Sequence, residues 1–421
     1  MGTGTLVNWL ESKGIDLPRL GGKRPVRLGF DWVLVVLTVC LVVFGLLMVY
    51  SASADFSYQQ YGSETYTIIR QIRFVFIGAI AALVFSMLNY QSWRKLAPYA
   101  MLGVILLLLF VQIVGEERLG ATRSFAGGSY QPSELAKLVM ILYLSVWLFS
   151  HREDLSSVSL GIIPLGVILG FVGLLILWQP DLSAFITVII MGALLFFLAS
   201  KSLRQVIYIA IIASGIVLPG FILIPTGKKR IAEFIAGWQD VLLSSEHVKR
   251  GMEAFVAGGW FGVGIGKGQA KLVALPFPHT DSIFAVIGEE VGAIGAFILL
   301  LVYLALLWRG MRIARRAPDV LGRLMAGGLT FWIVFEAMLN MGVIIGALPF
   351  AGNALPFISS GGSSMVVSLS AIGILLNISR HAEKVEEKKE RTFNAVVDLR
   401  GRDRRRRVSG AVNSASVSYR K

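Results

Sequence analysis

The chain has 421 residues, of which 55% are hydrophobic and only 16% are charged, and its mean hydropathy is +0.70. Soluble domains average about 25% charged residues, so this composition excludes an ordinary soluble protein and indicates an integral membrane protein. The formal net charge of +14 does not require a nucleic-acid partner, because basic residues also mark the cytoplasmic side of membrane proteins.

The first 29 residues form a polar segment that we expect to be a cytoplasmic leader. The apolar run that follows is longer than the core of a signal peptide, which has about 7–15 residues, so we expect a retained membrane span. Cys40 lies inside this run and is the only cysteine. A disulfide framework and a cysteine metal cluster are therefore excluded.

Ten stretches are long and apolar enough for membrane helices, which need about 20 mostly apolar residues. The sequence therefore predicts an all-α polytopic membrane protein with ten transmembrane helices in a domain over 30–380. The predicted spans are 30–50, 74–89, 96–114, 135–149, 160–178, 184–199, 206–224, 283–308, 324–348 and 363–378.

The connections between these spans set the predicted orientation. Most Lys and Arg residues fall in connections on the same side as the amino terminus, which predicts that both termini are cytoplasmic. On the outer side, the connection 225–282 between spans seven and eight is far longer than about 12–15 residues, so we expect it to be ordered and functional. Its glycine-rich run 258–268 suits a backbone that closely approaches a ligand or a membrane surface.

The C-terminal segment 381–421 is basic and contains few aromatic residues. We expect a largely disordered cytoplasmic tail. Anionic lipid head groups are one partner that fits it, and docking of another protein is the alternative.

Ionisable side chains inside the predicted spans are costly unless they are paired or face a wet cavity. Glu134 and Lys137 are three residues apart, which places acid and base on one helix face as either a structural ion pair or a ligand-orienting group. Glu289, Glu290 and Glu336 are expected to share one structural polar cluster inside the bundle.

A second group of polar residues is predicted at the outer membrane boundary. Asp281 follows a loop rich in Pro and Gly and precedes an apolar segment, so its carboxylate can meet both polar and lipid-linked molecules. His279 is expected to hydrogen-bond near it rather than to bind a metal. Arg123 and Lys267 are candidates for binding a diphosphate, and a solvated loop charge is the alternative for Arg123.

Five ordered motifs resemble those of the SEDS family (shape, elongation, division and sporulation), which includes FtsW and RodA. They span most of the membrane region and leave out only the leader and the tail. The motifs are GATR at 120–123, QPSELAK at 131–137, QPDL at 179–182, the segment 279–290 that contains HTD and GEE, and PFISSGGSS at 356–364.

This resemblance implies a ten-helix peptidoglycan glycosyltransferase of the bacterial cytoplasmic membrane. Such an enzyme polymerises lipid II, a disaccharide peptide on a polyprenyl diphosphate, and works with a class B penicillin-binding protein and other division or elongation proteins. The family aspartate that matches Asp281 is regarded as essential, and the residues that match Glu134 and Lys137 line the same cavity. Arg123 matches the family arginine, and Ser363 lies in the last motif as a further substrate-binding candidate.

The sequence departs from the family pattern near two of these motifs. Ser124, followed by Phe125, stands where an aromatic residue usually follows the arginine, and Phe277-Pro278 replaces Pro-Glu before the histidine. These changes concern acceptor positioning more than the chemistry. The extended leader and basic tail favour the division type, FtsW, within the family.

The residues are consistent with glycosyl transfer from a polyprenyl diphosphate. Asp281 would act as general base, and Arg123, Lys137 and Lys267 would neutralise the leaving diphosphate, with or without a divalent cation such as Mg²⁺ or Mn²⁺. No protein metal site and no resident cofactor are predicted. A lipid II flippase and a non-catalytic scaffold of the cell-wall machinery are the two alternatives, and an assay of polymer formation separates them from the enzyme.

Overall fold

In a computed structural model of the protein, the described residues are 30–114, 116–118, 121–124, 130–153, 155, 157–200, 207–208, 211, 215, 225–273 and 275–385. Only the backbone is described for the strands in 116–124. The predicted leader, and the tail from 386 onward, lie outside these residues. The seventh predicted span, 206–224, also lies outside them except at four positions.

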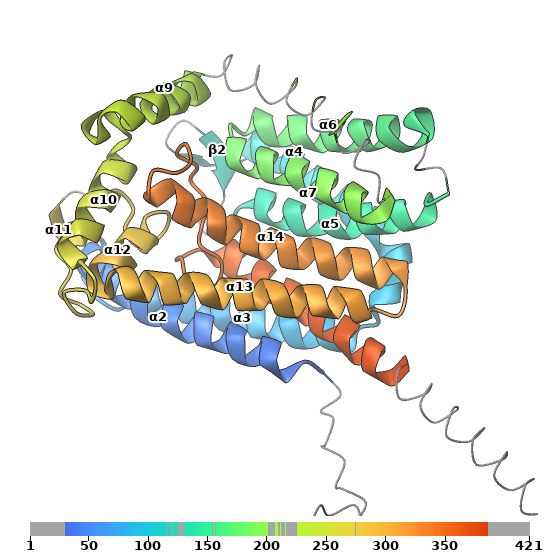
Figure 1. Cartoon of the computed structure of the whole chain (residues 1–421), viewed down its shortest axis with the longest axis horizontal. Coiled ribbons are helices and arrows are strands. Elements are labelled where there is room, and N and C mark those ends of the chain that lie inside the picture. The colour runs from blue at the N-terminus through green and yellow to red at the C-terminus, as the bar shows by residue number, and fades with distance from the viewer. Residues whose placement is uncertain are drawn as a thin grey trace, which may run out of the picture.

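Long helices run side by side and form a bundle (Figure 1). Nine helices of the described residues are long and apolar enough to cross a membrane, and each overlaps one of the ten predicted spans. They are α2 (Trp32–Tyr61), α3 (Tyr66–Met87), α4 (Trp93–Val114) after the turn η1 (Tyr90–Ser92), α5 (Pro132–Ser150), α6 (Ile163–Trp178) after the π-turn η2 (Val158–Ile162), α7 (Leu182–Ser200), α13 (Gly292–Arg316), α14 (Val320–Ile344) and the C-terminal helix (Gly362–Val385). A tenth span stays a prediction.

Shorter elements gather at one end of the bundle, on the left in Figure 1. The predicted long connection contains α9 (Pro225–Gln239), η3 (Val241–Leu243), α10 (Glu246–Gly258) and α11 (Ala270–Val273), and α10 packs on α12 (Ile283–Glu290) and α14. An antiparallel hairpin of β1 (Glu116–Arg118) and β2 (Ala121–Ser124) lies between α4 and α5 and was not predicted.

The predicted span 283–308 is wrong as a single helix, because the chain breaks between α12 and α13. Gly292 adopts φ +81°, and a Cβ there would lie 2.4 Å from the backbone nitrogen of Gly262. All eight residues of α12 are buried, whereas α13 begins at Gly292 and provides the span. Hydropathy alone does not distinguish a buried apolar helix from a spanning one, so it predicts α12 and the first part of α13 as a single span.

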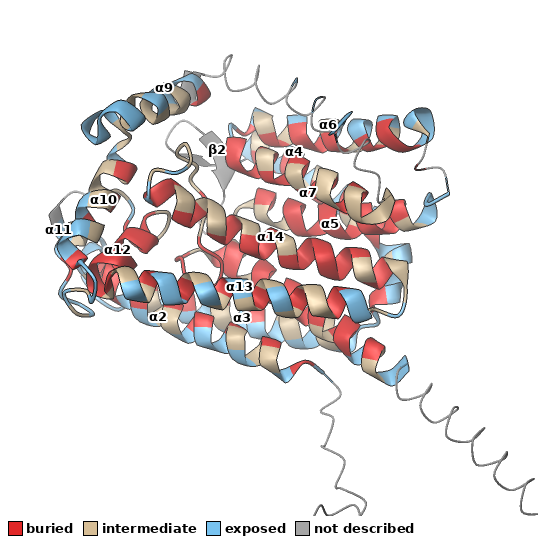
Figure 2. Cartoon of the chain, viewed as in Figure 1, coloured by how far each residue is buried: buried red, intermediate tan, exposed pale blue. Residues whose placement is uncertain are grey.

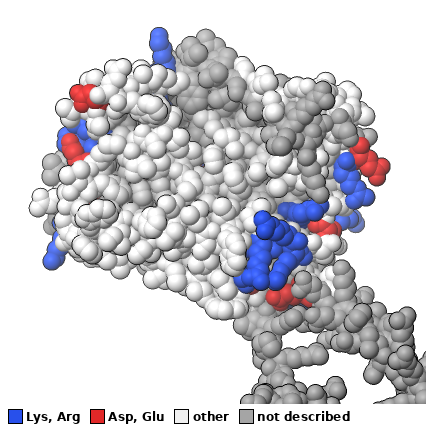
Figure 3. Space-filling view, viewed as in Figure 1, with Lys and Arg blue, Asp and Glu red and all other residues white. Residues whose placement is uncertain are grey.

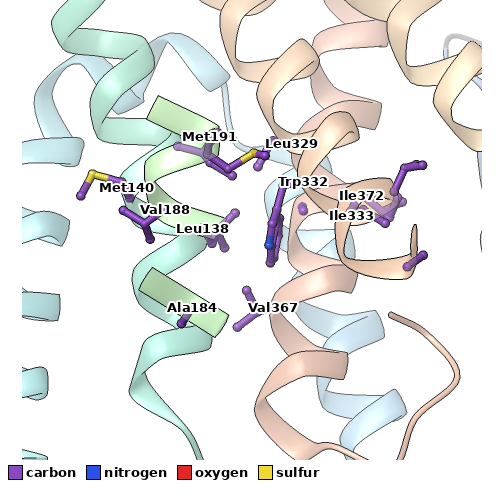
Figure 4. Close-up of a cluster of buried hydrophobic side chains, with 14 of the residues drawn as sticks. Leu138, Met140, Ala184, Val188, Met191, Leu329, Trp332, Ile333, Val367 and Ile372 are labelled. Carbon is purple, nitrogen blue, oxygen red and sulfur yellow. The ribbon is translucent and has the colours of Figure 1, made fainter. Parts of the chain in front are cut away.

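The interior of the bundle is formed by α5, α7, α14 and the C-terminal helix, which are mostly buried in Figure 2. Trp332 of α14 is fully buried among Leu138, Val188 and Val367, which come from the other three helices (Figure 4). Small residues allow this close packing, since a Cβ on Gly328 would lie 2.8 Å from Ile141 and from Leu195. Close approach through small residues is typical of membrane helices.

The outer surface of the bundle is apolar, with charged residues gathered towards its two ends (Figure 3). Phe76, Val167 and Leu174 are each at least 64% exposed along this surface. Large exposed side chains of this kind suit hydrocarbon rather than water. The chain is therefore a multi-pass membrane protein.

The break at Gly292 yields a stability prediction. Gly292→Ala should lower the melting temperature in detergent, because the new Cβ meets backbone and a non-glycine residue at positive φ costs about 1–3 kcal/mol. Gly103→Ala in α4 is the matched control, since a Cβ there meets nothing within 4 Å. Equal melting temperatures for the two variants would contradict the account of the break.

Candidate functional site

Two loops that carry family-like motifs are hydrogen-bonded to each other at the end of the bundle. The Ser359 hydroxyl donates to the carbonyl of Thr280 (2.7 Å), and the Ser360 backbone N–H donates to the carbonyl of His279 (2.8 Å). These bonds join segments almost 80 residues apart in the chain. The loop that carries Asp281 is thereby fixed against the segment that leads into the C-terminal helix.

Asn340 of α14 holds the backbone of Asp281 directly. Its side-chain amide donates to the Asp281 carbonyl (2.8 Å) and to the Asn353 carbonyl (2.7 Å). A Cβ on Gly352 would lie 2.9 Å from the Asp281 carboxylate, so this glycine leaves room for the carboxyl group. Asp281 is half-buried, just before α12, and its carboxylate lies beside Gly352.

Two of the three non-glycine residues with positive φ in the described part of the chain lie in these two loops, and the third is Pro180. Phe277 has φ +50° and Phe357 has φ +68°, although neither residue is glycine. Such conformations are costly for bulky residues and persist where the surroundings impose them, often at functional sites. The Phe277 carbonyl accepts hydrogen bonds from the backbone N–H groups of Thr280 and Ser282, which closes a tight turn around Asp281.

His279 is buried beside this turn. Its ring packs against Phe56 with centroids 4.7 Å apart, and its Nδ1 has no hydrogen-bond partner among the described residues. Burial, with a smaller contribution from Arg70, lowers the pKa of His279 to about 4. The ring is therefore neutral at pH 7, and its expected hydrogen bond to Asp281 stays a prediction.

Lys137 forms the second part of the site. Its ammonium donates to Glu134 (2.9 Å), which confirms the predicted pair on α5, and also to Glu336 of α14. Lys137 is only 4% exposed, and Glu134 Oε2 is buried without a hydrogen-bond partner among the described residues. Sequence spacing could not reveal the bond to Glu336, because the partner lies on another helix.

The prediction that Glu289, Glu290 and Glu336 share one cluster is wrong, because these residues belong to two separate groups of hydrogen bonds. Glu336 bonds Lys137 inside the bundle, whereas Glu289 and Glu290 bond the glycine-rich segment that follows α10. Sequence alone showed that three acids must be buried. It could not show which cations and N–H groups would satisfy each of them.

The glycine-rich segment wraps these two carboxylates. Backbone N–H groups of Gln269 (2.8 Å) and Gly266 (3.0 Å) donate to Glu289 and Glu290. A Cβ on Gly268 would lie 2.7 Å from the Glu289 carboxylate, which explains the glycine there. Lys271 and Glu290 form a buried ion pair (2.6 Å) that also includes the hydroxyl of Ser51.

A further polar group continues the site along α5 and was not predicted as part of it. The Asp181 carboxylate accepts from the Gln131 side chain (2.8 Å) and from the Ser133 hydroxyl (2.9 Å). Ser363 accepts from the backbone N–H of Gln131 (3.2 Å), which ties this group to the last motif. The QPDL motif at 179–182 marks Asp181 in the sequence, but it does not indicate what the aspartate binds.

No described contact joins the two predicted phosphate-binding residues, Arg123 and Lys267, to the Asp281 turn. Arg123 belongs to β2, and its side chain is outside the described residues. Lys267 is exposed in the glycine-rich segment. Within the described ranges, no group of three or more His, Cys, Asp or Glu could hold a metal ion. The roles of both cations, and of a divalent ion, stay predictions.

Comparison with known proteins identifies the family. The profile of the cell cycle protein family FtsW/RodA/SpoVE matches residues 31–384. The chain belongs to this family. It is 38% identical to the probable peptidoglycan glycosyltransferase FtsW of Trichlorobacter lovleyi over 85% of this chain and 95% of that protein, and 37% identical to stage V sporulation protein E of Bacillus subtilis over 84% and 97%.

Solved structures share the fold. One chain of a peptidoglycan synthase complex, described as coordinating polymerisation and crosslinking, aligns with a TM-score of 0.69 and 28% identity over 84% of this chain and 98% of that one. The rod shape determining protein RodA of Thermus thermophilus aligns with a TM-score of 0.60 and 26% identity over 85% and 98%. The bundle described above is therefore the fold of this family.

The buried histidine yields a prediction about pH. The unfolded chain takes up a proton near the ordinary histidine pKa of about 6.5, whereas folded His279 does so only near pH 4. Between these values the unfolded state binds more protons, so stability falls as the pH drops from about 6.5 to about 4. The melting temperature should fall over this window, and less steeply in His279→Gln. His151→Gln, at an exposed position, should keep the wild-type slope, and identical slopes for all three would contradict the assignment.

Proposed function

We propose that the protein is a peptidoglycan glycosyltransferase that polymerises lipid II on the outer face of the bacterial cytoplasmic membrane, with Asp281 as general base. Family membership supports the reaction class, since a relative 38% identical to this chain is named a probable peptidoglycan glycosyltransferase. The arrangement of polar residues at one end of the bundle supports the choice of base.

One observation carries the proposal: α14 holds both halves of the polar site. Asn340 binds the backbone of Asp281, and Glu336, one turn earlier on the same helix, binds Lys137. Residues four apart on a helix are neighbours, about 5–6 Å between their Cβ atoms. The Asp281 turn and the Glu134–Lys137 pair therefore belong to one polar region.

The proposed reaction needs one proton acceptor and a stabilised leaving group. Asp281 takes the proton of the acceptor sugar hydroxyl while that oxygen bonds to the anomeric carbon of the donor sugar. The bond from this carbon to the diphosphate breaks at the same time, and the polyprenyl diphosphate leaves with the electron pair. The Asp281 backbone is held by Asn340, so the turn that carries the carboxylate does not have to be ordered when the substrate binds.

The cations divide into two roles in this proposal. Lys137 lies between the carboxylates of Glu134 and Glu336, so it positions both of them. Its charge is shared with these two acids and cannot neutralise the diphosphate by itself. Arg123 and Lys267 are left to bind phosphate oxygens, a task for which the planar fork of arginine is well suited. A divalent cation carried by the diphosphate would add charge neutralisation. His279 and Ser363 border the same region as substrate contacts.

The proposed orientation follows from charge. Arg315 and Arg316 end α13 at the pole of the bundle opposite Asp281, and basic residues favour the cytoplasmic side. Both termini are then cytoplasmic, and α9 to α12 lie outside the membrane. The synthase-complex relative supports partnership with a transpeptidase of the penicillin-binding class and with division or elongation proteins.

The test is a polymerisation assay with purified protein and lipid II. Asp281→Asn keeps the size of the side chain but removes the base, so the rate should fall about 10²-fold or more. Asp240→Asn is the matched control, because this exposed acid caps η3 in the same outer connection and Asn can also cap. Unchanged polymerisation by Asp281→Asn would overturn the assignment of the base. Lipid translocation without polymer by the wild type would favour a flippase, and neither activity would favour a scaffold.

A further inference from the structure

A groove of about 640 Å³ opens on the side of the bundle between α2, α3 and the C-terminal helix, away from the Asp281 site. Its volume lies within the range of about 300–1,000 Å³ that is usual for small-molecule sites. Val39, Ala79 and Leu369 line its inner part, and Phe30, Ser86 and Arg380 line the part near the Arg380 end of the bundle. None of these residues is used by the proposed reaction.

A regular contact between α3 and the C-terminal helix forms the back of this groove. Asn377 donates to the Ser86 carbonyl (2.8 Å), a Cβ on Gly373 would lie 2.3 Å from the Ala82 carbonyl, and a Cβ on Gly78 would lie 2.6 Å from Leu369. The contacts recur every four residues on both helices, so the two helices run parallel and in close contact. The back wall of the groove is therefore formed by two tightly packed helices.

The walls offer hydrocarbon rather than hydrogen bonds. Thr38 and Ser86 are the two hydroxyl residues of the lining, and each donates to a carbonyl of its own helix, Leu34 (2.9 Å) and Leu83 (2.7 Å). The rest of the lining is apolar except for Arg380. An occupant of the inner part must therefore be an apolar chain.

The length of the groove fits one leaflet of a bilayer. Leu369 and Arg380 are eleven residues apart, about 16 Å at 1.5 Å per residue, which is about half of a hydrocarbon core of about 30 Å. The groove thus runs from mid-membrane to the surface at the basic end of the bundle. An acyl chain of a lipid in that leaflet also extends from the membrane surface to mid-membrane.

The charge at the mouth selects the head group. Arg380 is exposed and makes no hydrogen bond or ion pair with any described residue, and exposed Lys384 follows one turn later. Arginine binds phosphate oxygens through its planar fork, and basic residues near a membrane surface attract anionic lipids. We propose that this groove is a binding site for an anionic phospholipid, with an acyl chain between α2, α3 and the C-terminal helix and the phosphate on Arg380. This inference does not depend on the polymerase activity.

The test is lipid retention by the full chain, measured by native mass spectrometry after reconstitution in nanodiscs with equal parts of phosphatidylglycerol and phosphatidylcholine. The wild type should retain phosphatidylglycerol in about fivefold preference, and Arg380→Gln should remove this preference. Arg316→Gln, an exposed arginine at the same end outside the groove, should keep it.

A second pair of variants tests the acyl chain. Ala79→Trp places a large side chain in the groove and should abolish retention of both lipids. Ile80 is the next residue, is exposed and lies outside the groove, so Ile80→Trp should keep the retention. Melting temperatures of the two variants report whether each is folded. Wild-type retention by both Arg380→Gln and Ala79→Trp would overturn the proposal. Loss in Ala79→Trp alone would overturn the assignment of an anionic phospholipid.

Discussion

The structure depends on burying polar side chains of α14 inside a membrane bundle. Glu336 and Asn340 are each 2% exposed, and such groups are costly in hydrocarbon unless they are satisfied. Each is bonded to a segment distant in sequence: Glu336 to Lys137, and the side-chain NH₂ group of Asn340 to the backbone carbonyls of Asp281 and Asn353. The cost of burying these groups is thus offset only when the two segments are correctly placed.

A second constraint supports the Asp281 turn from the opposite side. Asp281 lies just before α12, and the far end of α12 carries Glu289 and Glu290, which bind Lys271, Ser51 and backbone N–H groups of the glycine-rich segment. Because all eight residues of α12 are buried, this short helix cannot move without exposing charges and apolar surface together. The carboxylate therefore lies at the end of a rigid element, which favours preorganised chemistry.

The parts of this arrangement that depend on residues close together in the sequence could be predicted, and the contacts between distant segments could not. Nine of the spans and the Glu134–Lys137 pair follow from hydropathy and local spacing. The break at Gly292 did not, because a buried apolar helix and a spanning helix have the same composition. The bonds from Glu336 to Lys137 and from Asp181 to Gln131 join different helices, so no local pattern encodes them. The glycine content of the 258–268 run predicts a close approach of its backbone to a ligand or a membrane surface, and it does not reveal that the backbone also encloses the carboxylates of Glu289 and Glu290.

We propose that Asp281 and the Lys137 group form one catalytic unit joined through α14. A double-mutant cycle of Lys137→Met and Asn340→Ala, scored by the rate of lipid II polymerisation per folded molecule, tests it most directly. The account predicts strong non-additivity, with the double variant losing at least about fivefold less than the product of the two single losses. Asn377→Ala, a buried asparagine at the other end of the bundle, should combine multiplicatively with Asn340→Ala. Multiplicative losses for Lys137→Met and Asn340→Ala as well would contradict the account.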